Sequence, residues 1–174
     1  TPLTISVIPA IAAFKAKKSL GESKNVIESS MRIATIFALP MAIGMSVLSQ
    51  PIMTGAYGST AEGGSLLAIM GISSFFVCIV AVSTAILQAG GLERIPMYNM
   101  LIGGALNIAV SWVLLGNHQI NIYGSAIGTL ASYLVMCSAN IFFIVRKMPE
   151  RPKLSSAFLK PAINALLMGA AAWL

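Results

Sequence analysis

Few residues in this chain could carry out chemistry, and their spacing does not bring them together. The single histidine, His118, lies far in sequence from both cysteines, Cys78 and Cys137, so no Cys or His cluster has the spacing of a metal site. No glycine-rich run is followed by the Lys-Ser/Thr pair of a phosphate-binding loop. The sequence therefore predicts no catalytic residues, no metal and no cofactor. The carboxylates are spread over separate segments: Glu22, Glu28, Glu62, Glu93 and Glu150.

The polar residues that stand out instead are asparagines inside apolar runs. Asn107, Asn140 and Asn164 each lie in a long apolar run, where an amide without a partner is costly. Two interpretations stay open, namely a hydrogen bond between helices and the wall of a hydrated transport pathway. Ser111 follows Asn107 at a spacing of four residues and is the fourth pathway candidate. We expect Asn99 and Gln88, near the ends of their runs, to be interfacial.

Prolines and glycines mark candidate hinges. Pro40 lies in the middle of an apolar run, where it removes a helix hydrogen bond and favours a kink. Gly44 follows one turn later, and Pro9 has the same effect in the first run. Each position is either a passive bend or a hinge for movement, and the sequence does not decide between the two.

Composition defines the elements that must position these residues. Hydrophobic residues make up 57% of the 174 residues and charged residues only 9%, which excludes an ordinary soluble domain and a disordered chain. Four runs are long enough to cross a bilayer as helices: 33–54, 65–87, 95–116 and 120–145. The end runs, 1–14 and 154–174, bring the prediction to an all-α membrane bundle of six transmembrane segments, one domain over 1–174. Since both end runs look cut, we expect a piece of a longer protein.

The eleven basic residues predict the orientation. All of them fall in or beside alternate connections, namely 15–32, 89–94 and 146–160, whereas the intervening connections have none. The positive-inside rule then places these connections in the cytoplasm, so that the first residues enter from the outer side. The net charge of +6 predicts attraction to anionic membrane lipids and no nucleic-acid partner. Within the loop 15–32, Ser19 and Glu22 have the spacing of a capping box, which leaves open a short interfacial helix.

Small residues recur every three or four positions along all four complete runs. Such stripes are typical of helix–helix contacts in membranes, and a pair of small residues at Gly124 and Gly128 fits the same pattern. The predicted contact stripes are Thr35, Ala38, Ala42, Ser46 and Ser49; Ser74, Cys78, Ala81, Ala85 and Gln88; Asn99, Gly103, Asn107 and Ser111; and Ser125, Thr129, Ser132, Met136 and Asn140.

Three stretches carry a family resemblance. They are 39–53 (LPMAIGMSVLSQPIM), 85–104 (AILQAGGLERIPMYNMLIGG) and 120–129 (INIYGSAIGT), with 6–12 (SVIPAIA) as a fourth, shorter match. Together they resemble the second half of flippases of the multidrug/oligosaccharidyl-lipid/polysaccharide exporter superfamily. Within this superfamily they most resemble the stage V sporulation protein B and lipid II flippase group of polysaccharide biosynthesis proteins.

The resemblance implies a cell-membrane transporter that flips a lipid-linked oligosaccharide or a peptidoglycan precursor by alternating access. The partners it implies are the lipid-linked sugar substrate and the remaining N-terminal half of the same transporter. Because the spans contain no basic residue for an anionic headgroup, we expect the charged site on that other half, with Asn107, Ser111 and Asn140 on the opposite wall. Two alternatives stay open: a Na⁺- or H⁺-coupled multidrug antiporter, and a subunit of a membrane polysaccharide polymerase.

Overall fold

The computed structural model describes residues 20–58, 63–115 and 121–147, and every regular element in them is a helix. The end runs 1–14 and 154–174, and with them Pro9 and Asn164, lie outside these described residues. Within the described residues the helices are α2 (Leu20–Val47), α3 (Ser49–Tyr57), α4 (Gly64–Ala89), α5 (Arg94–Leu115) and α6 (Asn121–Lys147).

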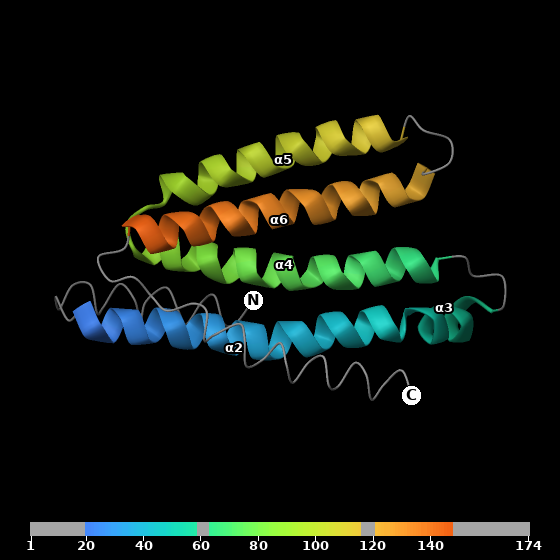
Figure 1. Cartoon of the computed structure of the whole chain (residues 1–174), viewed down its shortest axis with the longest axis horizontal. Helices are drawn as coiled ribbons and strands as arrows, with labels where there is room; N and C mark the ends of the chain where they lie inside the picture. The colour runs from blue at the N-terminus through green and yellow to red at the C-terminus, as the bar shows by residue number, and fades with distance from the viewer. Residues whose placement is uncertain (1–19, 59–62, 116–120, 148–174) are drawn as a thin grey trace.

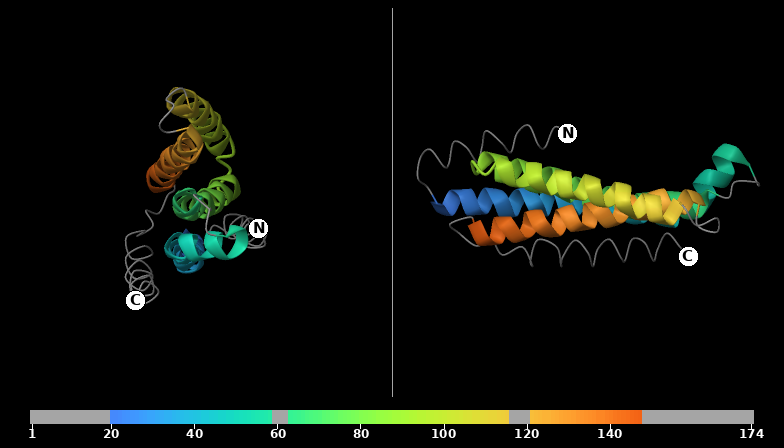
Figure 2. Two further views of the ribbon diagram at one scale, coloured as in Figure 1. Left: turned by 90° about the vertical axis from the view of Figure 1, so that its right-hand side faces the viewer. Right: turned by 90° about the horizontal axis from the view of Figure 1, so that it is seen from above.

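The four long helices lie side by side in one row, in the order α5, α6, α4, α2 (Figure 1). The view along the helix axes shows that the row is bent rather than flat (Figure 2). Although a short turn joins α4 to α5, these two helices have little contact, because α6 packs against both of them. The central pair, α4 and α6, therefore links the two outer helices.

All four long helices have the length and apolarity needed to cross a membrane. The candidate spans are Asn25–Val47, Gly64–Ala89, Arg94–Leu114 and Tyr123–Lys147. The runs 65–87, 95–116 and 120–145 are thus confirmed as helices, and the run 33–54 is helical with different bounds. The two predicted end segments lie outside the described residues. Apolar side chains cover the outer faces of the row, and Trp112 on α5 is 80% exposed. An exposed apolar face of this kind suits hydrocarbon rather than water.

The first predicted boundary is wrong, because residues 20–32 are not a loop. They form the first part of α2, which begins at Leu20 and continues without interruption to Val47. The physical reason is an apolar face that the loop assignment overlooked: Ile27 and Met31 precede Ala34 and Ala38 at helical spacing, and all four are buried. Instead of a short interfacial helix, residues 20–32 belong to one long helix, while Ser19 lies outside the described residues.

The same predicted run, 33–54, is also too long at its other end. The helix breaks at Leu48, and the short helix α3 begins at Ser49. Pro51 explains the break, since its ring would clash with the carbonyl of Val47 if α2 continued, whereas the first turn of a new helix tolerates proline. Figure 2 shows that α3 points in a different direction from the four long helices.

The turn between α4 and α5 is set by one glycine. Gly91 has a φ of +71°, and its N–H donates to the carbonyl of Gln88 while the N–H of Leu92 donates to that of Leu87. This pair of bonds is the Schellman arrangement that ends a helix with a left-handed residue, usually glycine. It reverses the chain within a few residues, as the sequence predicts for 89–94.

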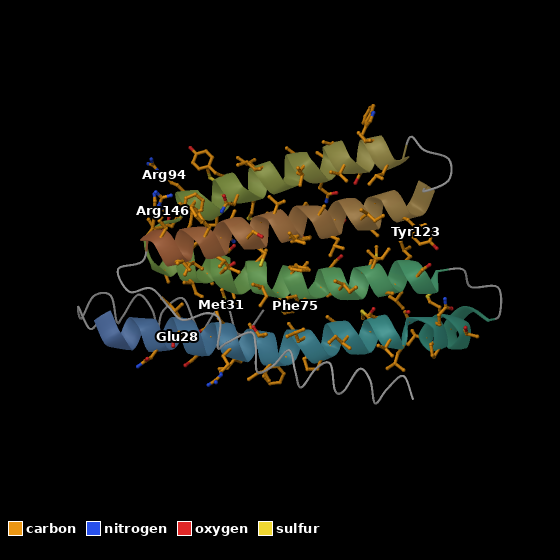
Figure 3. All side chains as sticks on the ribbon, viewed as in Figure 1. Glu28, Met31, Phe75, Arg94, Tyr123 and Arg146 are labelled. Carbon is orange, nitrogen blue, oxygen red and sulfur yellow. The ribbon has the colours of Figure 1, made fainter. Side chains whose placement is uncertain are left out.

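The largest buried side chains gather on both sides of α4, where it packs against α2 and α6. Met31 packs in one cluster with Ile79, Ile86, Leu87 and Ile144. Figure 3 shows Met31 near the end of the row at which Arg94 and Arg146 are also found. The apolar cluster holds the helices together beside the polar contacts described next.

Candidate functional site

Asn140 on α6 is the centre of a buried polar contact between three helices. Its side chain is 1% exposed, and its Oδ1 accepts a hydrogen bond of 2.8 Å from Asn99 Nδ2 on α5. Its Nδ2 donates to Ser83 Oγ at 3.1 Å and to Thr84 Oγ1 at 3.2 Å, both on α4. We call Asn140, Asn99, Ser83 and Thr84 the polar junction. It joins α4, α5 and α6 through directional bonds.

The contact between α5 and α6 follows a regular antiparallel register. Asn99 meets Asn140, and four residues further along α5 a Cβ on Gly103 would collide with the Met136 side chain, four residues back on α6. After two more turns of α5, Ser111 lies against Gly128. The stripe that the sequence predicted on α5 is therefore the surface that packs on α6, which confirms its role in helix contact.

Asn107 and Ser111 form a second polar pair on this surface. Ser111 Oγ donates to Asn107 Oδ1 over 3.1 Å, and both side chains are half-buried. A Cβ on Gly128 would lie 2.5 Å from Ser111 Oγ and 3.2 Å from Asn107 Oδ1, so only a glycine fits opposite the pair without displacing it. The structure thus places Asn107 and Ser111 at the edge of the α5–α6 contact, while Asn140 lies inside the junction.

The contact between α2 and α4 is built from small residues instead. A Cβ on Gly71 would lie 3.2 Å from both the carbonyl oxygen of Ala42 and the nitrogen of Ser46, so the two backbones approach each other directly. Thr35 is buried, but its hydroxyl donates to the carbonyl of Met31 in its own helix. From Thr35 to Ser49 no side-chain hydrogen bond crosses to a described residue of α4. We call this contact, from Thr35 on α2 to Ser49 at the start of α3 and with Gly71 on α4, the α2–α4 seam.

The predicted stripe on α4 is corrected by the structure. Ser74, Cys78 and Gln88 are exposed, and the buried surface of α4 includes Ser73 and Ser83 instead. The reason is that α4 has a neighbour on each side, so its buried positions spread around the helix and do not follow a single stripe of small residues. Gly124 and Gly128 on α6 are both buried, as predicted for that pair.

A hydrogen bond at the opposite end also joins α4 to α6. Ser65 Oγ and Tyr123 OH lie 2.6 Å apart in an exposed position near the start of both helices. Figure 3 shows Tyr123 at the end of the row away from Arg94 and Arg146. The α4–α6 pair is therefore bonded near both of its ends.

The two described hinge candidates lie within one helix. α2 is continuous through Pro40 and Gly44, and Gly44 supplies the carbonyl that accepts the N–H of Leu48 over 2.9 Å. The change of helix direction comes at Leu48, one turn after Gly44. Whether Pro40 or Gly44 acts as a hinge stays a prediction.

The electrostatics of the described spans are plain. The described residues within 33–92 and within 95–145 include no Asp, Glu, Lys or Arg, and the described part of the chain has no group of three His, Cys, Asp or Glu that could hold a metal ion. In the described residues no buried side-chain nitrogen or oxygen lacks a hydrogen-bond partner. The arrangement can hold and orient helices, and the described charged residues lie in the first part of α2, at or beside the α4–α5 turn and at the end of α6.

Comparison with known proteins places the chain in a family. The sequence family described as "Lipid II flippase MurJ" matches residues 2–174. The chain belongs to this family. The sequence is also 25% identical over 170 residues to the "Uncharacterized membrane protein YabM" of Bacillus subtilis (strain 168), a match that covers 97% of this chain and 31% of that protein.

The chain thus spans about a third of the length of the curated relative it matches. No solved structure matches the chain significantly. The resemblance noted from the sequence is confirmed at the level of the family. With four helices that can cross a bilayer and a membrane protein as relative, the chain is a multi-pass membrane protein.

Three members of the polar junction were missed as site residues. Asn99 is buried between helices, not at the surface where its position near the end of a run suggested it would be. Ser83 and Thr84 lie outside the predicted α4 stripe. The available signal was that Asn140 must find partners on another helix, and Asn99, Ser83 and Thr84 lie near the same end of their helices as Asn140 does.

Proposed function

We propose that this chain forms part of a transporter that flips a lipid-linked oligosaccharide, or a peptidoglycan precursor of the lipid II type, across the cytoplasmic membrane by alternating access. The observation that carries the proposal is the match of the lipid II flippase family over residues 2–174. Transporters built from helix bundles typically move by rocking one bundle against another around a central site. The remaining N-terminal half is the second bundle in this proposal.

The lack of charge within the described spans supports the proposal that this part of the transporter is a wall of the pathway. A pyrophosphate headgroup needs cationic donors, and the described residues within 95–145 contain none. The headgroup site then belongs to the other half, and this chain carries out no chemical step itself. It lines the pathway and transmits movement.

Asn107 and Ser111 are the residues we place on that wall. Both are half-buried at the edge of the α5–α6 contact, so a small opening of this edge would expose them to water. Asn140 would reach the pathway only if the polar junction separated, because its three hydrogen bonds are all to neighbouring helices.

The basic ends of the helices support a cytoplasmic location for one end of the row. Arg94 begins α5, while Arg146 and Lys147 end α6, and Figure 3 shows Arg94 and Arg146 at the same end. By the positive-inside rule this end faces the cytoplasm.

Depletion of the full-length protein in its host tests the function. Lipid-linked sugar precursors would be quantified in each membrane leaflet. We expect accumulation on the cytoplasmic side, relieved when the protein is restored. An unchanged distribution combined with altered sensitivity to cationic drugs would contradict the flippase and favour the antiporter.

Cysteine accessibility tests the wall. In a full-length background without Cys78 and Cys137, we expect Asn107→Cys to react with a small aqueous thiol reagent, and substrate to reduce the reaction. Ile108→Cys, which is next in sequence but on the exposed apolar face, is the matched control and should stay unlabelled. Equal absence of labelling at positions 107 and 140 would exclude a hydrated wall here.

A further inference from the structure

Three exposed cations lie where α5 begins and α6 ends. They are Arg94, Arg146 and Lys147, which we call the basic end cluster. Glu93, which is also exposed, directly precedes Arg94. The three cations outnumber this one carboxylate, so the charge at this end of α5 and α6 is positive on balance.

The register of α5 and α6 brings the two arginines to one level. Asn99 is paired with Asn140, and Arg94 lies five residues before the first while Arg146 lies six residues after the second. At 1.5 Å per residue in antiparallel helices, these steps are about 7.5 Å and 9 Å in the same direction. Figure 3 shows both arginines at this end, on neighbouring helices.

Aromatic and apolar side chains lie next to these cations. The Arg146 guanidinium is 5.6 Å from the centre of the Phe142 ring, and Lys147 Nζ is 5.9 Å from that of Phe143. On α5, Tyr98 and Leu101 follow Arg94 at helical spacing and are both more than half exposed. The cations at the helix ends are thus directly followed, toward the middle of each helix, by exposed aromatic and apolar side chains.

We infer that the basic end cluster and the exposed α5 face form a binding site for an anionic phospholipid. Arginine pairs with phosphate oxygens through two parallel N–H donors, and lysine adds a point charge. The ends of membrane-spanning helices lie at the depth of lipid phosphates, and the α5 face is suited to an acyl chain. The charge of the cluster and the apolarity of the face below it match the two parts of a phospholipid.

The basic end cluster shares no residue with the proposed wall of Asn107 and Ser111, so this inference does not depend on the proposed function. α2 offers a comparison within the same chain, because Lys24 and Arg32 are basic as well but belong to the helix at the other side of the row. A general attraction to anionic membranes would involve both groups alike. A site would depend on Arg94 and Arg146.

Native mass spectrometry of the full-length protein tests this difference. The probes are phosphatidylglycerol and phosphatidylcholine with identical acyl chains, titrated onto wild type, R94Q/R146Q and the control K24Q/R32Q, which loses the same charge from α2. We expect R94Q/R146Q to bind phosphatidylglycerol about tenfold more weakly, with phosphatidylcholine unchanged, since each basic residue near a lipid surface contributes a several-fold gain. The control should keep the affinity of wild type, and R94K/R146K should recover part of the loss.

Three outcomes would overturn the proposal. An equal loss in R94Q/R146Q and K24Q/R32Q would show general electrostatic attraction, and full retention in R94Q/R146Q would show that the arginines bind no lipid. A loss confined to undecaprenyl pyrophosphate, added as a third probe, would assign the cluster to a lipid-linked pyrophosphate instead. Leaflet distribution of sugar precursors would not change in the first two cases, so these outcomes leave the flippase proposal standing.

Discussion

The polar junction and the α2–α4 seam hold neighbouring helices of one row by different means. In the junction, Asn140 makes three side-chain hydrogen bonds that fix the rotation and the axial position of α5 and α4 relative to α6. In the seam, Gly71 lets the α4 backbone approach that of α2, and no described side-chain hydrogen bond crosses it.

The two kinds of contact resist different movements. Directional bonds are broken by rotation or axial sliding, whereas close packing of small residues sets mainly the distance between helices. We therefore expect α4, α5 and α6 to behave as one unit and α2 to be the helix that can shift against it. Four substitutions test this difference.

Asn140→Ala should have the largest effect. It removes three hydrogen bonds, leaves the Asn99 amide without its partner on α6, and creates a small cavity, whereas Ser83 keeps its bond to the carbonyl of Val80. Hydrogen bonds between membrane helices contribute roughly 0.6 kcal/mol each on average, and unpaired buried groups add to the cost, so we expect a loss of about 3 kcal/mol in the free energy of unfolding. Unfolding in mixed detergent micelles measures it. Ser138→Ala, an exposed position on the same helix, is the control, and an equal loss there would contradict the junction.

Gly71→Leu should separate α2 from α4. The new side chain would start 3.2 Å from the backbone of Ala42 and Ser46, which cannot move as a flexible side chain can. We expect a loss of about 2 kcal/mol, typical of overpacking, and a larger α2–α4 distance between spin labels with the α4–α6 distance unchanged. Gly104→Leu is the matched control, because nothing lies within 4 Å of a Cβ there. If both variants behave alike, the seam is not a close contact.

Gly128→Ala should have a smaller effect, because the atom nearest to the new methyl group belongs to a side chain that can rotate away. Its Cβ would lie 2.5 Å from Ser111 Oγ, and the serine can rotate away at the expense of its bond to Asn107. We expect a loss of about 1 kcal/mol, and Ser111→Ala should relieve most of the strain in the double variant. A double-mutant cycle in the unfolding assay measures the coupling. Additive effects would show that Gly128 and Ser111 do not touch.

Tyr123→Phe should have the smallest effect. It removes the hydroxyl that bonds to Ser65 in an exposed position, where water replaces the partner. We expect a change of about 0.5 kcal/mol or less in the free energy of unfolding. A loss as large as that of Asn140→Ala would mean that the outer end of the α4–α6 pair, and not the polar junction, dominates the unit.

Much of the fold followed from the sequence, because apolar runs of bilayer length have one structural solution. Three of the four complete runs, those beginning at 65, 95 and 120, match α4, α5 and α6 within three residues at each end. The run 33–54 failed because it was defined by hydropathy alone. The apolar face of residues 20–32 is only one side of a helix, and Pro51 ends a helix without interrupting an apolar run.

The candidate site was less predictable. The stripe from Asn99 to Ser111 correctly indicated a contact surface, since its spacing belongs to one helix. Which helix it contacts depends on the order of the row, and sequence neighbours α4 and α5 turn out to be separated by α6. Asn99 and Asn140, 41 residues apart, could not be paired without that order.

The separation of α4 from α5 by α6 also has a consequence during synthesis. The hairpin of α4 and α5 leaves the ribosome before α6 does, so Asn99, Ser83 and Thr84 are in place before Asn140 can bond to them. At the usual 5–20 residues per second, the interval of 41 residues between Asn99 and Asn140 lasts about 2 to 8 s. During that time the insertion machinery, a lipid headgroup or water has to provide hydrogen-bond partners for these amide and hydroxyl groups. Nascent chains that stop before residue 140 would therefore be the form of this protein most exposed to quality control.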